Sequence, residues 1–154
     1  MLFLVFHLGK DRYAIDAAQV VEVLHSVETK TIPNTQPGVA GIFDYHGSPV
    51  PLIDLAELIL GRPSHRWMST RIILVNYLKE GGPMRLLGVL AEQVTETLRR
   101  QEEDFTESGV ADVATGCLGR VTIDPAGIVQ RVEIRNLLSQ SVRDLLFQEG
   151  SATV

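Results

Sequence analysis

Short runs in which apolar and polar residues alternate recur along the whole chain. The runs are separated by turns rich in Gly, Pro and Asp. Residues 2–8 form the first β-prone run, and the polar segment 9–12 leads to a second run at 13–15, which predicts an opening hairpin. Later runs at 71–77 and 84–91 predict a further hairpin. With the shorter runs at 94–98, 119–123 and 128–132, the pattern predicts about eight to ten short strands and two or three helices.

Three segments show helical spacing instead. Residues 17–25 follow the capping residue Asp16 and carry apolar side chains on one face, so Glu22 falls on the wetter side. Residues 55–60 form a short helix or a single helical turn. Residues 134–147 carry an apolar stripe that predicts a C-terminal helix.

The segment 41–54 predicts a hairpin that is suited to contact with another protein. Gly47 can adopt the positive φ that a tight reversal needs. Pro49 and Pro51 lack a backbone donor, so the returning strand is expected at a sheet edge. An edge strand has unpaired backbone groups that a partner chain can use.

Composition narrows the function classes. A hydrophobic fraction of 45% and a charged fraction of 21% are those of an ordinary globular protein. The net charge of −5 argues against nucleic-acid binding, which needs a basic face. No run of 18 apolar residues occurs, and residues 1–8 are expected to be a strand rather than a signal peptide. The single cysteine excludes an intrachain disulfide, and we expect a cytoplasmic protein.

Candidate chemistry is sparse. Asp44, His46 and Asp54 could form a small metal or acid–base site, and this alternative stays open beside a plain binding surface. We expect Cys117 to be a packed thiol. Trp67 fits either an exposed anchor for a partner or a lid over the core. No nucleotide-binding or serine-hydrolase motif is present, so we expect no cofactor.

Several segments in fixed order resemble the CheW-like chemotaxis coupling proteins, over nearly the whole chain. The segments are Phe3–Gly9, Tyr13–Asp16, Val20–Val23, Ile32–Thr35, Val39–Ile42, Val50–Leu55, Thr70–Val75, Leu87–Leu90 and Val94–Leu98. The resemblance implies a mainly β fold of two SH3-like five-stranded β-barrel subdomains, with a short helix and a C-terminal helix. It places one domain at 1–148 and a flexible tail at 149–154. The subdomains are expected roughly at 14–69 and 70–132, with the N-terminal strand and C-terminal helix completing the second.

The resemblance also implies a function without catalysis. Family members are adaptors that join the cytoplasmic tip of a chemoreceptor to the regulatory domain of a CheA-type histidine kinase. Self-association through the barrel ends is a further expectation, as is a location at the inner face of the membrane. Expected partner-binding positions are Val20, Glu22, Gly41, Asp44, Tyr45, His46 and Gly47.

One departure from the family pattern stands at the centre of the predicted hairpin. The usual Asn-Leu-Arg-Gly is here Asp44-Tyr45-His46-Gly47, so a titratable imidazole replaces a permanent guanidinium. We hypothesise that Glu22 pairs with His46. We further hypothesise a dedicated pathway, such as a Wsp-type surface-sensing system that controls a diguanylate cyclase. A free-standing regulatory domain of kinase type, which binds another protein without a receptor, is the remaining alternative.

Overall fold

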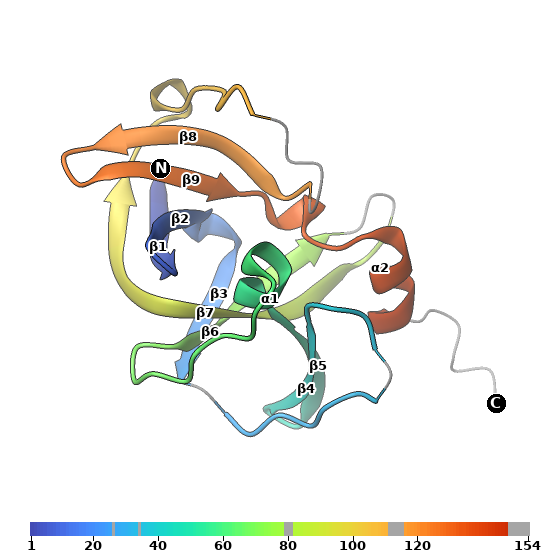
Figure 1. Ribbon diagram of the computed structural model, residues 1–154. Coiled ribbons are helices and arrows are strands. Elements are labelled where there is room, and N and C mark those ends of the chain that lie inside the picture. The colour runs from blue at the N-terminus through green and yellow to red at the C-terminus, as the bar shows by residue number, and fades with distance from the viewer. Residues whose placement is uncertain (26, 34, 79–81, 111–115, 148–154) are drawn as a thin grey trace.

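The computed structural model describes residues 1–25, 27–33, 35–78, 82–110 and 116–147, so the expected tail at 149–154 lies outside the described residues. Strands dominate the described part, and the predicted mainly β fold is confirmed (Figure 1). The strands are β1 (Leu2–Leu8), β2 (Asp11–Asp16), β3 (Val20–His25), β4 (Val39–Tyr45), β5 (Ser48–Asp54), β6 (Arg71–Leu78), β7 (Met84–Arg99), β8 (Leu118–Asp124) and β9 (Gly127–Val132). The helices are α1 (Leu55–Leu60), α2 (Gln140–Leu146) and the 3₁₀ turns η1 (Ala17–Gln19), η2 (Glu102–Asp104) and η3 (Ile134–Asn136).

The strands fall into two groups that share β7. In the described residues the first group pairs in the order β3-β6-β7-β5-β4, and the second in the order β7-β1-β2-β9-β8. Each group therefore contains five strands, and the path of paired strands is open at β3, β4 and β8. Strands from both sides of the expected subdomain boundary at residue 70 share the first group, because β6 pairs with β3.

A single long strand connects the two groups. Two runs were expected at 84–91 and 94–98, but β7 is one strand of 16 residues that curves from one group into the other (Figure 1). Gln93 has a positive φ of 46° at the bend, and the pairing with β1 shifts register between Val5 and His7. A bulge of this kind bends a strand without ending it.

The prediction of a helix at 17–25 is wrong. Asp16 caps a helical turn as predicted, with its carboxylate accepting from the Ala18 N–H at 3.0 Å, but the turn ends at Gln19. The rest of the segment is strand β3. The β-branched residues at 20, 21 and 23 disfavour helix, and β6 offers a strand to pair with.

The other helix predictions hold in part. α1 forms as predicted and ends at Gly61, which has a φ of +79°. The helix expected at 134–147 is instead η3 followed by α2, because Ser139 caps a new helix by accepting from the Val142 N–H at 3.3 Å.

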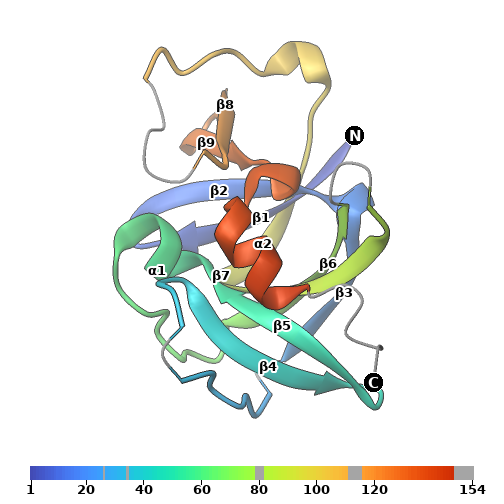
Figure 2. The ribbon, with the colours of Figure 1, turned by 90° about the vertical axis from the view of Figure 1, so that its right-hand side faces the viewer.

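The main apolar core lies between the two strand groups. It joins buried side chains of both groups with those of the helical segments, such as Phe6, Ile53, Leu55, Tyr77 and Leu137. Figure 2 shows α1 and α2 between the two groups, where they close this seam. Among the described residues, no helix has the length and apolar character needed to cross a membrane.

Candidate functional site: the edge of β3 and the β4–β5 turn

The tip of the β4–β5 hairpin is a two-residue turn formed by His46 and Gly47. Both residues have positive φ, +50° and +88°, as in the type I′ turns that suit twisted hairpins. Asp44 fixes the turn, since its carboxylate accepts a hydrogen bond from the Gly47 N–H at 2.7 Å. The predicted positive φ of Gly47 is confirmed, and His46 also has a left-handed conformation.

Tyr45 connects this turn to β3. Its hydroxyl donates a hydrogen bond to Glu22 Oε1 at 2.8 Å. That bond is the main reason why the pKa of Tyr45 is raised, with burial and the Glu22 charge adding to it. The His46 ring lies edge-on to the Tyr45 ring, with centroids 4.4 Å apart. The hypothesised pair of Glu22 and His46 is therefore corrected: Glu22 does face the hairpin, but its hydrogen-bond partner is Tyr45.

β3 supplies the other half of the surface. Among the described strands it pairs with β6 alone, so its second edge has backbone groups available to a partner. Val21 and Val23 are 45% and 40% exposed on this strand, while Val20 and Leu24 pack against the cores. We use the name β3–turn surface for the residues Val20, Val21, Glu22, Val23, Asp44, Tyr45, His46 and Gly47.

Gly41 is buried in β4, against Thr29 and Lys30. Its φ is +143°, and a Cβ atom added there would stand 2.1 Å from the Lys30 carbonyl oxygen. The close approach lets Lys30 and Ile42 exchange two backbone hydrogen bonds of 2.8 and 2.9 Å. Gly41 thus shapes the wall of a shallow groove of about 630 Å³, which runs between residues 28–30 and the hairpin.

The alternative metal or acid–base site is not assembled. Asp44 lies near the turn, opposite Pro49, whereas Asp54 lies at the far end of β5. Asp54 is 4% exposed and is used structurally, because it accepts from the Ala56 N–H at 3.1 Å and from the Ser64 hydroxyl at 2.5 Å. In the described part of the chain, no group of three or more His, Cys, Asp or Glu residues could hold a metal ion.

The edge position expected for the two prolines is confirmed for their half of β5. β5 pairs with β4 along its length, but with β7 only from Leu52 to Asp54. Pro49 and Pro51 therefore lie where β5 has one strand partner among the described residues.

Two other candidates are also placed. Cys117 is fully buried in the main core, as expected of a packed thiol. Trp67 is 46% exposed and stacks on the His65 ring, with centroids 4.7 Å apart. It belongs to none of the apolar clusters of the described residues, which favours the exposed anchor over the lid.

The comparisons with known proteins agree on one family. Residues 2–142 match the CheW-like domain family. The chain is 28% identical over 103 residues to the chemotaxis protein CheW of Klebsiella aerogenes, and 24% identical over 103 residues to that of Helicobacter pylori. Each alignment covers 67% of this chain and 59% of the relative, so the match spans less than two thirds of these curated relatives.

A solved structure shows the same fold. The crystal structure of the scaffolding protein TtCheW from Thermoanaerobacter tengcongensis matches with a TM-score of 0.78 at 23% sequence identity. The match covers 90% of this chain and 87% of that one. This likeness supports the expected arrangement of two SH3-like subdomains.

Proposed function

The chain belongs to the CheW-like domain family, and we propose that it is a non-enzymatic adaptor in a chemosensory pathway. It joins the cytoplasmic tip of a methyl-accepting chemoreceptor to a CheA-type histidine kinase, in arrays at the inner face of the membrane. The observation that carries this proposal is the β3–turn surface, where an open strand edge and two exposed valines lie beside the Glu22 carboxylate, which Tyr45 holds by a hydrogen bond.

The geometry of Glu22 supports a direct role in binding. Oε1 accepts from Tyr45, which holds the carboxylate in one orientation before a partner arrives. A pre-ordered side chain loses less conformational entropy when a complex forms. The open edge of β3 suits either an added strand or an apolar helix face laid across Val21 and Val23.

Binding to purified partners tests the proposal. We expect Glu22→Arg to weaken binding to the kinase regulatory domain by about tenfold or more, since it reverses a central charge. Tyr45→Phe removes only the hydrogen bond to Glu22, so we expect binding to weaken by about two- to fivefold. Glu103→Arg is the matched control, because Glu103 is an exposed carboxylate in η2, away from β3 and the hairpin. Unchanged binding of Glu22→Arg, with the control also unchanged, would contradict the proposal.

The same experiment separates the adaptor from the remaining alternative. An adaptor binds the receptor tip as well as the kinase. Binding to the kinase alone, with no retention on an immobilised receptor tip, would instead indicate a free-standing regulatory domain.

We also propose that the pathway is a dedicated one whose output is a diguanylate cyclase. This proposal is supported by His46, which stands where the family motif has an arginine and lacks the permanent charge of a guanidinium. Deleting the gene should lower cellular cyclic diguanylate and leave swimming chemotaxis intact. Lost chemotaxis with unchanged cyclic diguanylate would refute this output while leaving the adaptor role in place.

A further inference from the structure

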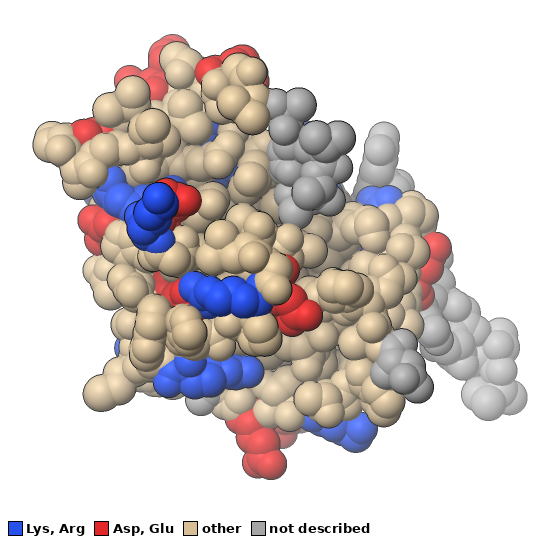
Figure 3. Space-filling model, viewed as in Figure 1, with Lys and Arg blue, Asp and Glu red and all other residues tan. Residues whose placement is uncertain are grey.

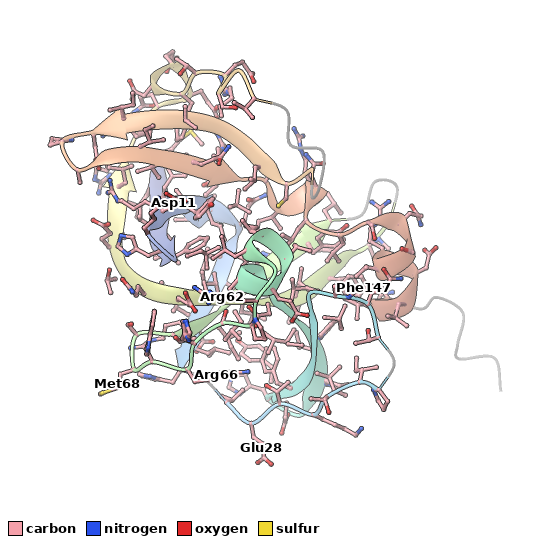
Figure 4. All side chains as sticks on the ribbon, in the orientation of Figure 1. Asp11, Glu28, Arg62, Arg66, Met68 and Phe147 are labelled. Atoms are coloured by element: carbon pink, nitrogen blue, oxygen red, sulfur yellow. The ribbon has the colours of Figure 1, made fainter. Side chains whose placement is uncertain are left out.

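The loop between α1 and β6 is a second exposed feature, separate from the β3–turn surface. We call residues 61–70 the Trp67 loop. It presents Trp67 at 46% exposure and Met68 at 95% exposure. Figure 4 shows Met68 projecting away from the body of the protein, with Arg62 and Arg66 on the same loop.

Two buried carboxylates fix the first half of the loop. Asp54 accepts from both the Ser64 N–H at 2.8 Å and the Ser64 hydroxyl at 2.5 Å. Glu92 is fully buried and accepts from Arg62 at 2.9 and 3.2 Å and from the His65 N–H at 2.5 Å. Burial opposes ionisation of Glu92, but the Arg62 and His65 hydrogen bonds outweigh it, so its pKa lies below the ordinary value.

Thr70 fixes the second half. Its hydroxyl donates to the His65 carbonyl at 2.6 Å and accepts from the Trp67 N–H at 3.1 Å. Its own N–H donates to the Trp67 carbonyl at 3.1 Å. A loop of ten residues is therefore held in one shape by buried polar groups, while its largest apolar side chains stay in solvent. Pre-ordered aromatic side chains of this kind are typical of binding hot spots.

The charge of the loop indicates what it binds. No Asp or Glu occurs from residue 58 to residue 79. Arg62 is paired with the buried carboxylate of Glu92, so the local positive charge comes from Arg66 and Arg71. Figure 3 shows Lys and Arg side chains over this part of a molecule whose net charge is −5. The net negative charge disfavours an anionic membrane, and the local positive charge favours an acidic protein segment.

We propose that the Trp67 loop docks an acidic segment of a partner protein, in which an aliphatic or aromatic side chain is flanked by carboxylates. The apolar side chain packs on the exposed face of Trp67 and on Met68. The carboxylates lie against Arg66 in the loop and Arg71 at the start of β6. This contact is additional to the receptor and kinase contacts of the β3–turn surface and does not depend on them.

The chain carries its own reporter for this test. It has one tryptophan, so all indole fluorescence comes from Trp67. A display library of random short peptides is selected on the full-length chain. Selected peptides are then titrated against the chain while the Trp67 emission is recorded.

We expect the selected peptides to be acidic with at least one large apolar residue, and to shift the emission to shorter wavelength. Arg66→Glu should weaken them by about tenfold. Arg99→Glu, at an exposed arginine of β7, should change binding by less than about twofold. Glu22→Arg should have no effect, which separates this proposal from the adaptor function.

Three results would overturn the proposal. One is selection of neutral or basic peptides, and another is equal binding by the Arg66→Glu variant. The third is an emission shift caused by vesicles of anionic phospholipid without any peptide that binds, which would assign the loop to a membrane surface. Far-ultraviolet circular dichroism of each variant confirms that it is folded.

Discussion

Replacing Gly41 by alanine tests whether this position acts through the fold or through partner contact. Resemblance to the adaptor family places Gly41 among binding positions, yet it is buried beneath residues 29 and 30. The added Cβ would meet the Lys30 carbonyl oxygen at 2.1 Å and the Lys30 carbonyl carbon at 2.9 Å. Both atoms belong to the backbone of Lys30, so movement of a side chain cannot relieve the overlap.

The expected loss of stability has two sources. A side chain at a φ of +143° is strained by about 1–3 kcal/mol. Relieving the overlap means separating β4 from Lys30, which breaks two backbone hydrogen bonds worth about 1 kcal/mol each. The total is about 3–5 kcal/mol, a large part of the roughly 5–15 kcal/mol that stabilises an ordinary domain.

Urea unfolding followed by Trp67 emission and circular dichroism measures this loss. The midpoint should fall by about 2 M for a slope of about 1–3 kcal/mol/M. Gly47→Ala is the matched control, because that glycine also has positive φ but nothing within 4 Å of its added Cβ. For Gly47→Ala we expect a loss of stability of about 1–2 kcal/mol. A Gly41→Ala protein as stable as Gly47→Ala would refute the argument and return Gly41 to the binding surface.

Three further predictions follow from buried polar groups. The pKa of Glu92 is lowered, so the stability that its ionised form gives the folded protein is fully present above the ordinary pKa of 4.5 and is lost as pH falls further. In acid, the Trp67 emission should then move to longer wavelength before the whole protein unfolds. The Arg12 guanidinium lowers the pKa of Asp124 to about 2, so Asp124→Asn should destabilise the protein at neutral pH by about 1–3 kcal/mol. In acid-unfolding curves, the difference in stability from wild type should vanish as pH falls from 3.8 to about 2. The buried Tyr77 hydroxyl has no hydrogen-bond partner among the described residues, so Tyr77→Phe should raise the free energy of unfolding, measured with urea, by about 0.5–1 kcal/mol. A lower free energy of unfolding would reveal a partner.

Local patterns in the sequence predicted the hairpins well, since alternation and turn residues act over a few positions. The pairs β1–β2, β4–β5, β6–β7 and β8–β9 all form where the runs indicated. The segment at 17–25 failed because apolar spacing alone fits both a helix face and a strand edge. Only the presence of β6 beside it, nearly fifty residues later, decides between the two.

The candidate surface was predicted as a set of positions but not as a set of contacts. Gly47 and Asp44 interact within the turn, so local reasoning reaches them. The Tyr45–Glu22 bond joins residues 23 positions apart, and the Arg62–Glu92 pair joins residues 30 apart. No periodicity links such positions, and resemblance to the family suggested His46 in place of Tyr45.

The Tyr45 contact changes what the departure at His46 means. Had the imidazole been the partner of Glu22, replacing arginine would weaken an internal pair and leave the surface loosely ordered. Tyr45 holds the carboxylate instead, through a neutral phenol whose pKa the same bond raises. The carboxylate is therefore oriented independently of His46, whose side chain is exposed at the turn. The replacement of arginine at this position therefore leaves the orientation of Glu22 unchanged and alters only the side chain that the turn exposes.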